Sequence, residues 1–531
     1  MARPPLARPK GVPVWKDIGV APPPAAGTIE RKPIVIAGGG PIGMAMALDL
    51  GRRGHSVVVL TRWDFLPAYS KAICWSKRSL DILDRLGVGG RFVEKGIVWN
   101  VGKVFRGDNP APVYEFDLLP VKNQKNPAFV NLQQYYAEEY LYDAVKALSN
   151  IDFRAGHDVT GVTAGETSAI VDVACGDASY RIEADWLIAC DGNKSSVREM
   201  MGLDFDGRVF EDNFLIADIT MKGERPSERW FWFDPPFNRG QSVLLHKQPD
   251  DMWRIDFQVG WNIDRETVTH ADNVEPRIRA VLGEDVEFKK EWYSVYTFQC
   301  RRMARFVHGR VIFAGDSAHL VSPFGARGCN GGFADIDNLG WKLDLILNNE
   351  APENILETYN HEAIATADEN ILNSTRSTDF LTPKSAVSEA FRDAALTLAA
   401  EHAFARPFVN SGRLSTAVAY PESPLNTKDA DDWNGGVAPG SPPLDAPFGE
   451  GWLLDRLGGG FTLLSNGAAP ATEGVIAIDI SGRSDLGALI QRYELTPASA
   501  YLFRPDQYVA ARWKNPPAAA IAAALARAKG L

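Results

Sequence analysis

One carboxylate in this sequence, that of Asp316, is placed where a side chain can reach a ligand. The apolar run 311–314 ends abruptly at Asp316, which predicts a buried strand that delivers this carboxylate to a cleft. A glycine-rich loop containing Gly325 and Gly328 follows, and an amphipathic helix is expected from about Ala334. Backbone N–H groups and the positive dipole end at a helix N-terminus attract electron-rich or anionic ligands. The alternative is a strand–turn–helix corner whose glycines serve only tight turns.

A second anion-binding motif lies near the N-terminus. Gly38, Gly40 and Gly43 form G-x-G-x-x-G directly after the apolar run 33–37 and before an Ala- and Leu-rich helix. This is the context that the dinucleotide fingerprint requires. The first glycine makes the tight turn, the second lets a pyrophosphate approach the backbone, and the third allows close helix–strand packing.

The strand after this helix departs from the fingerprint. Residues 56–60 are apolar and complete a βαβ unit, but Thr61 and Arg62 follow them where an Asp or Glu normally holds the ribose hydroxyls. Asp64 is the nearest acidic residue that can substitute.

A third apolar run, 186–189, also ends in an acidic residue. Asp191 and a glycine follow it, and a helix carrying Ser195 and Arg198 comes next. Taken alone, this segment is also consistent with any strand–turn–helix corner.

Together, the three segments resemble the single-component (class A) FAD-dependent aromatic hydroxylases of the para-hydroxybenzoate hydroxylase and phenol hydroxylase type. The G-x-G-x-x-G after a strand, the D-G with Ser and Arg downstream, and the G-D followed by P-F-G-x-x-G-x-N are the three fingerprints of that family. The similarity covers roughly residues 32–380 and is greatest to the 3-(3-hydroxyphenyl)propionate hydroxylase-like branch. It is specific for FAD and for the enzyme class, not for the substrate.

The resemblance implies which residues bind FAD, without a covalent bond. Asp316 is expected to hold the ribityl chain, Asp191 to support the binding region, and Gln134 and Lys71 to lie on the phosphate side. Backbone groups of the glycine-rich loop are expected to stabilise the negative charge of reduced flavin, as donors in an oxyanion hole do. The complete expected set is Gly38, Gly40, Pro41, Ile42, Gly43, Thr61, Arg62, Lys71, Gln134, Asp191, Asp316, Gly325, Gly328, Cys329 and Asn330.

The resemblance also implies the reaction. NADH or NADPH reduces FAD as a transient co-substrate, because no second G-x-G-x-x-G follows a strand. O₂ then gives a flavin C4a-hydroperoxide that hydroxylates a phenolic ring, and Pro323 and Phe324 are expected near the reacting edge. Two alternatives are a flavin-dependent dehydrogenase or reductase without oxygen insertion and a non-catalytic flavin-binding scaffold.

Substrate activation calls for a base or hydrogen-bond acceptor beside the phenol hydroxyl, because deprotonation makes the ring electron-rich. The candidates are Tyr293, Tyr296 and His246, which lie in strands assigned to the roof of the substrate cavity. The alternative for each of them is a packed core residue. Arg239 is a candidate partner of a substrate carboxylate, although its Asn-Arg-Gly sequence also suits an exposed hairpin turn.

Composition narrows the class of protein. The net charge of −11 argues against a nucleic-acid partner, and no apolar run approaches the ~18–20 residues of a membrane span. The five cysteines show no C-x-x-C or metal-ligand spacing, so free thiols and no metal site are expected. We therefore expect a cytoplasmic enzyme acting on a small aromatic compound, with a homodimer as the candidate assembly.

The expected fold class is α/β, with a Rossmann-type FAD-binding domain interleaved with an antiparallel β-sheet substrate domain. The resemblance implies a C-terminal thioredoxin-like α/β domain, and it lacks redox cysteines because no Cys follows Cys329. The expected boundaries are a Pro-rich extended arm at 1–30, the FAD-binding domain at 31–208 and 300–380, the substrate domain at 209–299, a helix and linker at 381–448, and the C-terminal domain at 449–531. The arm is expected to be disordered or to lie on a neighbouring subunit.

Overall fold

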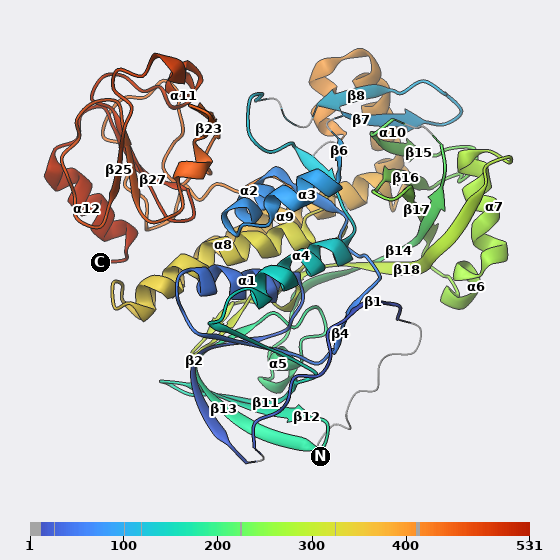
Figure 1. Cartoon of the computed structure of the whole chain (residues 1–531). Helices are drawn as coiled ribbons and strands as arrows, with labels where there is room; N and C mark the ends of the chain where they lie inside the picture. Colours follow the sequence, from blue (N-terminus) through green and yellow to red (C-terminus); the bar gives the residue numbers. More distant parts are fainter. Residues whose placement is uncertain are drawn as a thin grey trace.

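The computed structural model describes residues 12–25, 27–99, 101–117, 119, 121–223, 226–323, 325–409 and 415–531. Over these residues the fold is mixed α/β, with two eight-stranded sheets and a smaller four-stranded sheet near the C-terminus (Figure 1). The first eight-stranded sheet carries the glycine fingerprint, and the second forms the roof of a cavity.

The first sheet is built around strands that are parallel to one another. Its order is β10-β3-β2-β13, and β20 runs parallel to the end of β13. These strands are β2 (Ile29–Ala37), β3 (Val57–Thr61), β10 (Ile151–Ala155), β13 (Ala178–Ala189) and β20 (Val311–Phe313). Parallel strands end at the same edge, so Gly38, Asp191 and Asp316 meet there although they are far apart in sequence.

Antiparallel strands extend the other end of this sheet. The first half of β13 pairs with β12, which in turn pairs with β11, and β19 pairs with β20. Their bounds are β11 (Asp158–Ala164), β12 (Ala169–Cys175) and β19 (Val307–His308).

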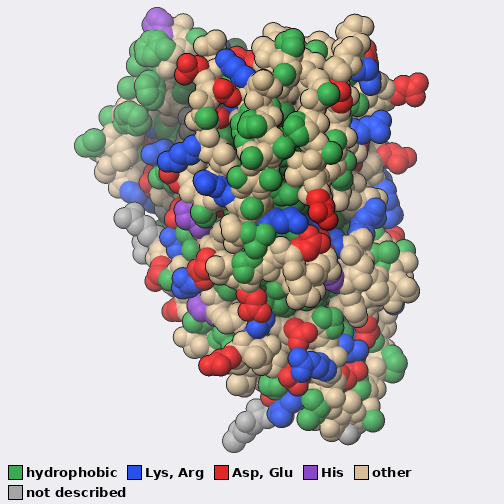
Figure 2. All heavy atoms as spheres, turned by 90° about the vertical axis from the view of Figure 1, so that its left-hand side faces the viewer, with side chains coloured by type: hydrophobic (Ala, Val, Ile, Leu, Met, Phe, Trp, Pro, Cys, Tyr) green, Lys and Arg blue, Asp and Glu red, His purple; other side chains and the backbone are tan. Residues whose placement is uncertain are grey.

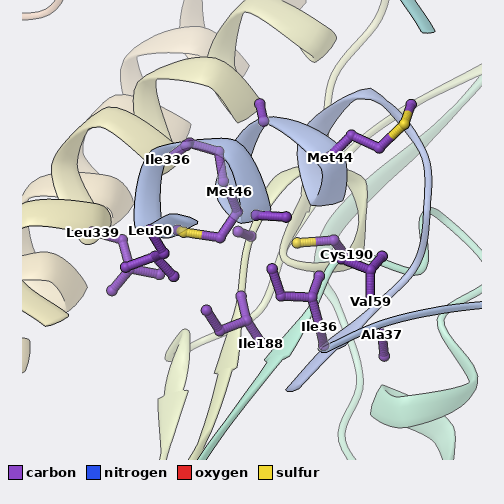
Figure 3. Packing of buried hydrophobic residues seen from close by; sticks show 14 of the residues in the cluster. Ile36, Ala37, Met44, Met46, Leu50, Val59, Ile188, Cys190, Ile336 and Leu339 are labelled. Atoms are coloured by element: carbon purple, nitrogen blue, oxygen red, sulfur yellow. The ribbon is translucent and has the colours of Figure 1, made fainter. Parts of the chain in front are cut away.

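Three helices cover one face of this sheet, namely α1 (Pro41–Arg52), α4 (Gln134–Lys146) and α8 (Gly328–Leu347) (Figure 1). Helix α1 lies between the other two, and its residues 43–51 are all buried. Figure 3 shows Met46 and Leu50 of α1 between the strand residues Ile36 and Ile188 and the α8 residues Ile336 and Leu339. The packing of α1 therefore fixes α8 over the strand ends.

The second sheet has the order β21-β18-β14-β17-β16-β15-β7-β8. All of its pairings are antiparallel except that between β15 and β7. The strands are β7 (Val101–Arg106), β8 (Tyr114–Asp117), β14 (Asp206–Met221), β15 (Arg229–Phe233), β16 (Ser242–Lys247), β17 (Met252–Gly260), β18 (Phe288–Arg302) and β21 (His319–Leu320). Strands β7 and β8 of this sheet come from inside the segment 31–208, which the sequence analysis assigned to the FAD-binding domain.

The two faces of the second sheet differ in chemistry, since side chains alternate along each strand. Leu215, Leu245, Ile255 and Phe257 point to an apolar face, which the hairpin of α6 (Arg265–Thr269) and α7 (Ala271–Leu282) covers. The opposite face carries charged side chains, described below with the cavity.

Smaller elements connect the two sheets. A three-stranded sheet has the order β5-β9-β6, and α2 and α3 follow β5 in the chain. Their bounds are β5 (Cys74–Ser76), β6 (Ile97–Trp99), β9 (Phe129–Asn131), α2 (Lys77–Arg85), α3 (Gly89–Lys95) and α5 (Ser196–Met200).

The C-terminal part forms a four-stranded sheet of order β25-β24-β26-β27, in which only β24 and β25 are parallel. Two long helices, α9 (Leu356–Leu381) and α10 (Ala386–Glu401), precede it, and residues 415–446 connect them to it without a regular element longer than a turn. The remaining bounds are β22 (Pro447–Phe448), β23 (Gly451–Trp452), β24 (Thr462–Ser465), β25 (Ile476–Asp479), α11 (Gly487–Tyr493), β26 (Ala500–Phe503), β27 (Val509–Trp513) and α12 (Ala518–Ala528).

A buried ionic network holds this C-terminal part against α8 and α9. The carboxylate of Glu362 accepts hydrogen bonds from Arg504 at 2.6 and 3.1 Å and from Lys342 at 2.9 Å, and all three side chains are fully buried. Burial alone would raise the pKa of Glu362, but the two cations outweigh it and hold that pKa below its usual range. Arg504 also pairs with Asp506, next to Gln507, which accepts from Arg78 of α2 at 2.8 Å.

The N-terminal arm lies on its own chain. Strand β1 (Val14–Asp17) pairs antiparallel with β4 (Phe65–Pro67). Residues 12–25 therefore have a defined place against their own chain, whereas residues 1–11 lie outside the described part of the chain.

The surface carries charges of both signs. On the face shown in Figure 2, Lys and Arg side chains are interspersed with Asp and Glu, as expected for a chain of net charge −11. No helix within the described residues is long and apolar enough to cross a membrane.

Replacing Glu362 tests the buried network. We expect Glu362→Gln to lower the free energy of unfolding by about 3 kcal/mol at pH 7, because it leaves buried cations without their carboxylate. A carboxylate whose pKa is depressed stabilises the fold above its unfolded pKa, about 4.3, and loses that effect as the pH falls further. The difference between variant and wild type should therefore shrink below that pH in thermal or urea unfolding.

The matched control is Glu357→Gln, on the same helix as Glu362. It removes an exposed carboxylate that pairs with Arg305 at 2.7 Å. It should cost less than about 1 kcal/mol, as exposed pairs do. Equal losses for the two variants would contradict the role given to Glu362.

Candidate active site

A cavity of about 710 Å³ extends from the carboxyl edge of the first sheet to the charged face of the second. Its volume lies within the range of cofactor and ligand sites, about 300–1,000 Å³. One end is lined by the glycine loop after β2 and the end of β3, and the other by residues of β14, β15, β16, β17 and β18. The N-terminus of α8 lies along it between these ends.

Most of the residues expected from the sequence line this cavity. They are Gly38, Gly40, Pro41, Ile42, Thr61, Arg62, Lys71, Gln134, Asp191, Asp316, Gly328, Cys329 and Asn330, together with His246, Tyr296 and Pro323. Gly43, Gly325 and Tyr293 are not among the lining residues, and Phe324 lies outside the described residues.

The three glycines of the fingerprint are required for different reasons. Gly38 has a φ of +115°, and a Cβ on it would lie 2.3 Å from the carbonyl oxygen of Cys190. A Cβ on Gly43 would lie 1.9 Å from the carbonyl oxygen of Gly38. A Cβ on Gly40 would meet no described atom within 4 Å, because it would point into the cavity. Gly38 and Gly43 therefore serve the fold, whereas Gly40 keeps space free for a ligand.

Asp335 of α8 holds the turn that carries Asp316. Its Oδ2 accepts from the backbone N–H of Gly315 at 2.8 Å and hydrogen-bonds to Nε2 of His319 at 2.7 Å. Burial alone would lower the pKa of His319, but the Asp335 carboxylate outweighs it and raises that pKa. The Asp316 side chain faces the cavity and forms no hydrogen bond or ion pair with another described residue. Desolvation raises the pKa of its carboxyl group. An unpaired carboxylate in that position suits a ligand hydroxyl.

Asp191 is only half satisfied by protein groups. Its Oδ2 accepts from the backbone N–H of Val197 at 3.0 Å and from the Ser196 hydroxyl at 3.3 Å. Its Oδ1 is buried and has no hydrogen-bond partner among the described residues. Asp191 thus supports the start of α5 and keeps one oxygen for a ligand.

The loop before α8 is fastened by the side chain of Asn330. Its Oδ1 accepts from the backbone N–H of Ser76 at 3.0 Å and the hydroxyl of Ser79 at 2.6 Å, and its Nδ2 donates to the Cys74 carbonyl at 2.9 Å. The side chain is therefore structural. The first backbone N–H groups of α8, from Gly328 onward, have no acceptor within the helix and are those that can meet an electron-rich ligand.

Lys71, Gln134 and Glu138 form the side wall of the cavity. Gln134 accepts from the backbone N–H of Lys71 at 3.2 Å and donates to Glu138 at 2.8 Å, so its amide is already engaged with protein groups. Lys71 is exposed to the cavity and is available to an anion. Burial raises the pKa of Glu138 to about 7. This carboxyl lines the cavity and was not among the residues expected from the sequence.

The other end of the cavity contains a charged group that sequence reasoning missed. Arg229 of β15 is buried, and no carboxylate among the described residues forms an ion pair with it. One guanidinium nitrogen lies 3.8 Å from the sulfur of Cys74, and its Nε has no hydrogen-bond partner among the residues described. Desolvation lowers the pKa of Arg229. The guanidinium lies over the rings of Trp99 and Phe231, 5.5 and 4.9 Å from their centroids, and the charge of Asp256 also acts on it. A buried cation that lines a cavity and has no ion pair suits an anion or a developing negative charge.

His246 and Asp256 lie near this cation on the next two strands of the sheet, β16 and β17. Nε2 of His246 is 3.2 Å from Oδ2 of Asp256, and Nδ1 of His246 has no partner among the described residues. Burial and the charge of Arg229 lower the pKa of His246 to about 4, so its imidazole is neutral at pH 7. With Nε2–H donating to Asp256, the lone pair of Nδ1 is left as a hydrogen-bond acceptor.

The tyrosine candidates are separated by strand alternation. Tyr296 lies opposite Phe214 and lines the cavity, and burial together with the charge of Asp316 raises its pKa. Tyr293, three residues earlier, points to the apolar face of the sheet and packs in the cluster under α7. The prediction that Tyr293 acts on the substrate is therefore corrected, because an odd spacing places a side chain on the opposite face.

Arg239 lies outside the cavity. Its guanidinium pairs with Asp108 at 2.5 Å, and its side chain is about half exposed. Arg239 therefore lies in an exposed turn, and not at a position where it could pair with a carboxylate inside the cavity.

Most of the first two sheets lies within the part of the chain that matches a known protein family. The family described as "FAD binding domain" matches residues 31–374. A probable NADH-specific resorcinol 4-hydroxylase of Rhodococcus jostii is 30% identical over 356 residues, which are 64% of this chain and 64% of that protein. A 3-(3-hydroxy-phenyl)propionate/3-hydroxycinnamic acid hydroxylase of Burkholderia cenocepacia is 27% identical over 337 residues, 63% of this chain and 60% of that protein. The chain thus spans less than two thirds of the length of these relatives.

Solved structures resemble nearly the whole chain. The flavin-dependent monooxygenase PieE, in complex with FAD and substrate, superposes with a TM-score of 0.77 at 22% identity, covering 94% of this chain and 99% of that one. An aklavinone-11 hydroxylase with FAD and aklavinone gives a TM-score of 0.76 at 20% identity, with 94% and 99% covered. At this identity the likeness establishes the fold.

The two glycines Gly40 and Gly43 allow ligand binding to be separated from folding. We expect Gly40→Val to fold with an unchanged melting temperature as apoprotein but to lose FAD, because its side chain would fill space in the cavity. Gly43→Val should lower the free energy of unfolding by about 3 kcal/mol through overpacking. Flavin content and apoprotein melting curves measure both effects, and full flavin occupancy in Gly40→Val would refute the position given to the cofactor.

Glu138 generates a prediction of pH-dependent stability. A carboxyl whose folded pKa is raised destabilises the fold increasingly as the pH rises from its unfolded pKa, about 4.3, to its folded value. Glu138→Gln should therefore stabilise the apoprotein by about 3 kcal/mol at pH 8 and by less than about 1 kcal/mol at pH 5. The exposed control Glu94→Gln should change stability by less than about 0.5 kcal/mol at either pH. A pH-independent effect of Glu138→Gln would contradict the raised pKa.

Proposed function

We propose that this chain, which belongs to the FAD binding domain family, is an NAD(P)H-dependent flavoprotein monooxygenase that hydroxylates a phenolic aromatic compound. The observation that carries the proposal is one continuous cavity with a dinucleotide-type glycine loop at one end and Arg229, His246 and Asp256 at the other. The names of the relatives, a resorcinol hydroxylase and a hydroxyphenylpropionate hydroxylase, support the substrate class.

The residues of the cavity fit FAD in four respects. Gly40 leaves space against the backbone, Asp191 and Asp316 keep carboxylate oxygens for ligand hydroxyls, and the N-terminus of α8 offers backbone N–H groups to an electron-rich ring. Lys71 adds a positive charge on the side wall. FAD, when bound, supplies the redox chemistry, namely acceptance of a hydride from NAD(P)H and activation of O₂.

Arg229 would activate the substrate by charge. A phenol has a pKa of about 10 in water, and a nearby cation lowers that value by favouring the phenolate. Because Arg229 is buried and has no ion-pair partner among the described residues, its charge is little screened. The deprotonated ring is richer in electrons at the ortho and para carbons, which favours electrophilic oxygen transfer.

His246 would orient the substrate hydroxyl. The Asp256 carboxylate accepts a hydrogen bond from Nε2–H of the imidazole, which leaves the lone pair of Nδ1 as an acceptor for the ligand. The imidazole accepts a hydrogen bond from the hydroxyl, while Arg229 favours the ionisation of that hydroxyl. Tyr296, whose raised pKa keeps it protonated, can donate a hydrogen bond from the same face. Pro323 lines the cavity close in sequence to the α8 loop and would contact the ring edge.

The domain assignments follow the same reasoning. We assign the first sheet with α1, α4 and α8 to a Rossmann-type FAD-binding domain interleaved with the substrate sheet. The order β25-β24-β26-β27, with only β24 and β25 parallel and α12 at the end, supports a thioredoxin-like domain. The sequence after Cys329 has no cysteine, so this domain serves assembly of the fold and not dithiol chemistry.

The reaction class is tested with a panel of phenols in the presence of NADH or NADPH. We expect at least one phenol to accelerate NAD(P)H oxidation with consumption of O₂ and to yield a product heavier by one oxygen in mass spectrometry. Substrate turnover without oxygen in the product would indicate the dehydrogenase or reductase alternative. Failure of every phenol to accelerate NAD(P)H oxidation would favour the scaffold alternative.

The role of Arg229 predicts a change in pH dependence. In Arg229→Met the acidic limb of the kcat/KM profile should move upward by about one pH unit or more, because the phenol is no longer acidified. KM should rise by about tenfold, the loss of roughly 1.4 kcal/mol of binding. The control is Arg239→Met, an exposed arginine outside the cavity, which should leave both unchanged. An unshifted profile in Arg229→Met would contradict substrate activation by this charge.

A further inference from the structure

The segment 13–21 runs along the outside of the cavity, upstream of the family match that begins at residue 31. The carbonyl of Pro13 accepts from the backbone N–H of Ala68 at 2.8 Å, and the N–H groups of Ile18 and Gly19 both donate to the Asp64 carbonyl at 3.0 Å. Together with the β1–β4 pairing, these bonds bind the segment to the chain that directly follows β3.

Side chains anchor the segment at both ends. Trp15 lies 4.4 Å from the ring of Tyr135 on α4 and donates its Nε1–H to Glu139 at 2.9 Å. At the far end, Ala21 accepts a hydrogen bond from Nε2 of His157 at 2.9 Å and donates its N–H to the Ala155 carbonyl at 2.9 Å. The segment therefore reaches from helix α4 to the turn between β10 and β11.

Ile18 is the point at which this segment enters the cavity wall. It lines the cavity together with Thr61, Arg62, Trp63 and His157. In the dinucleotide fingerprint, the residue after the second strand of the βαβ unit holds the ribose of the adenosine half. Thr61 occupies that place, so Ile18 borders the end of the cavity where adenosine belongs.

We propose that residues 13–21 form an adenosine-binding strap, in which Ile18 completes the wall beside Trp63 and His157 and retains FAD by enclosing its adenosine half. Thr61 cannot form the paired carboxylate hydrogen bonds that an Asp or Glu gives the ribose. Apolar enclosure compensates for this loss, because removing an aromatic base and its surroundings from water is favourable over the whole contact area. The strap thus adds to the affinity for the adenosine half of FAD, which FMN lacks.

The inference concerns cofactor recognition and does not depend on which substrate the enzyme hydroxylates. It is tested by titrating the apoprotein of the full chain with FAD and with FMN, which lacks the adenosine half, and following flavin fluorescence. The variants are Ile18→Ser, which changes the wall, and Trp15→Ala, which removes an anchor about one third exposed and leaves the wall residue in place. The control is Val14→Ser, an exposed residue of the same strand that does not line the cavity.

We expect both test variants to raise the Kd for FAD by about tenfold and to speed FAD release, with the Kd for FMN unchanged. Val14→Ser should match the wild type with both flavins. Equal weakening of FAD and FMN would show that the segment only supports the fold and would overturn the proposal. Unchanged FAD affinity in both test variants would overturn it as well.

Discussion

The hydrogen bonds of Asp335 are the constraint on which the cavity depends. This one buried carboxylate joins helix α8 to the turn after β20, through Gly315, and to His319. The helix is thereby held over the carboxyl edge of the first sheet, with its N-terminus along the cavity and Asp316 projecting into it. This polar link, between residues 20 apart in the sequence, adds to the apolar packing of α1 that also holds α8 over the strand ends.

The same helix connects the cavity to the C-terminal part of the chain. Asp337, two residues after Asp335, pairs with Arg78 at 2.5 Å, and Lys342 pairs with Glu362 in the fully buried network around Arg504. Buried charges of this kind cost desolvation energy that only complete pairing offsets. They specify one docking geometry, because a shifted interface would leave a cation or a carboxylate unpaired in the interior.

The second sheet uses its two faces for opposite purposes. The face under α7 is apolar and supplies packing, whereas the cavity face holds Arg229, His246, Arg254 and Asp256. Arg254 is neutralised by Asp218 at 2.7 and 2.8 Å and donates to the Ser70 carbonyl at 2.5 Å, so it positions the loop that carries Lys71. Arg229 has no such partner among the described residues. This difference marks the one arginine as structural and the other as available to a ligand.

The sequence alone determined the end of the cavity that carries the glycine loop, because its three motifs each follow directly from a strand, and parallel strands must end at a common edge. The mixed α/β fold and the FAD binding domain family, both expected from those local patterns, were confirmed. Only the tertiary structure decided which residues line the opposite end of the cavity and where the N-terminal arm lies. Arg229, His246 and Asp256 lie on three different strands, and their convergence depends on pairing register, as does the exclusion of Tyr293 in favour of Tyr296. Residues 13–21 carry no motif, and their position results from backbone hydrogen bonds to segments about 50 and 135 residues away, which no local periodicity encodes.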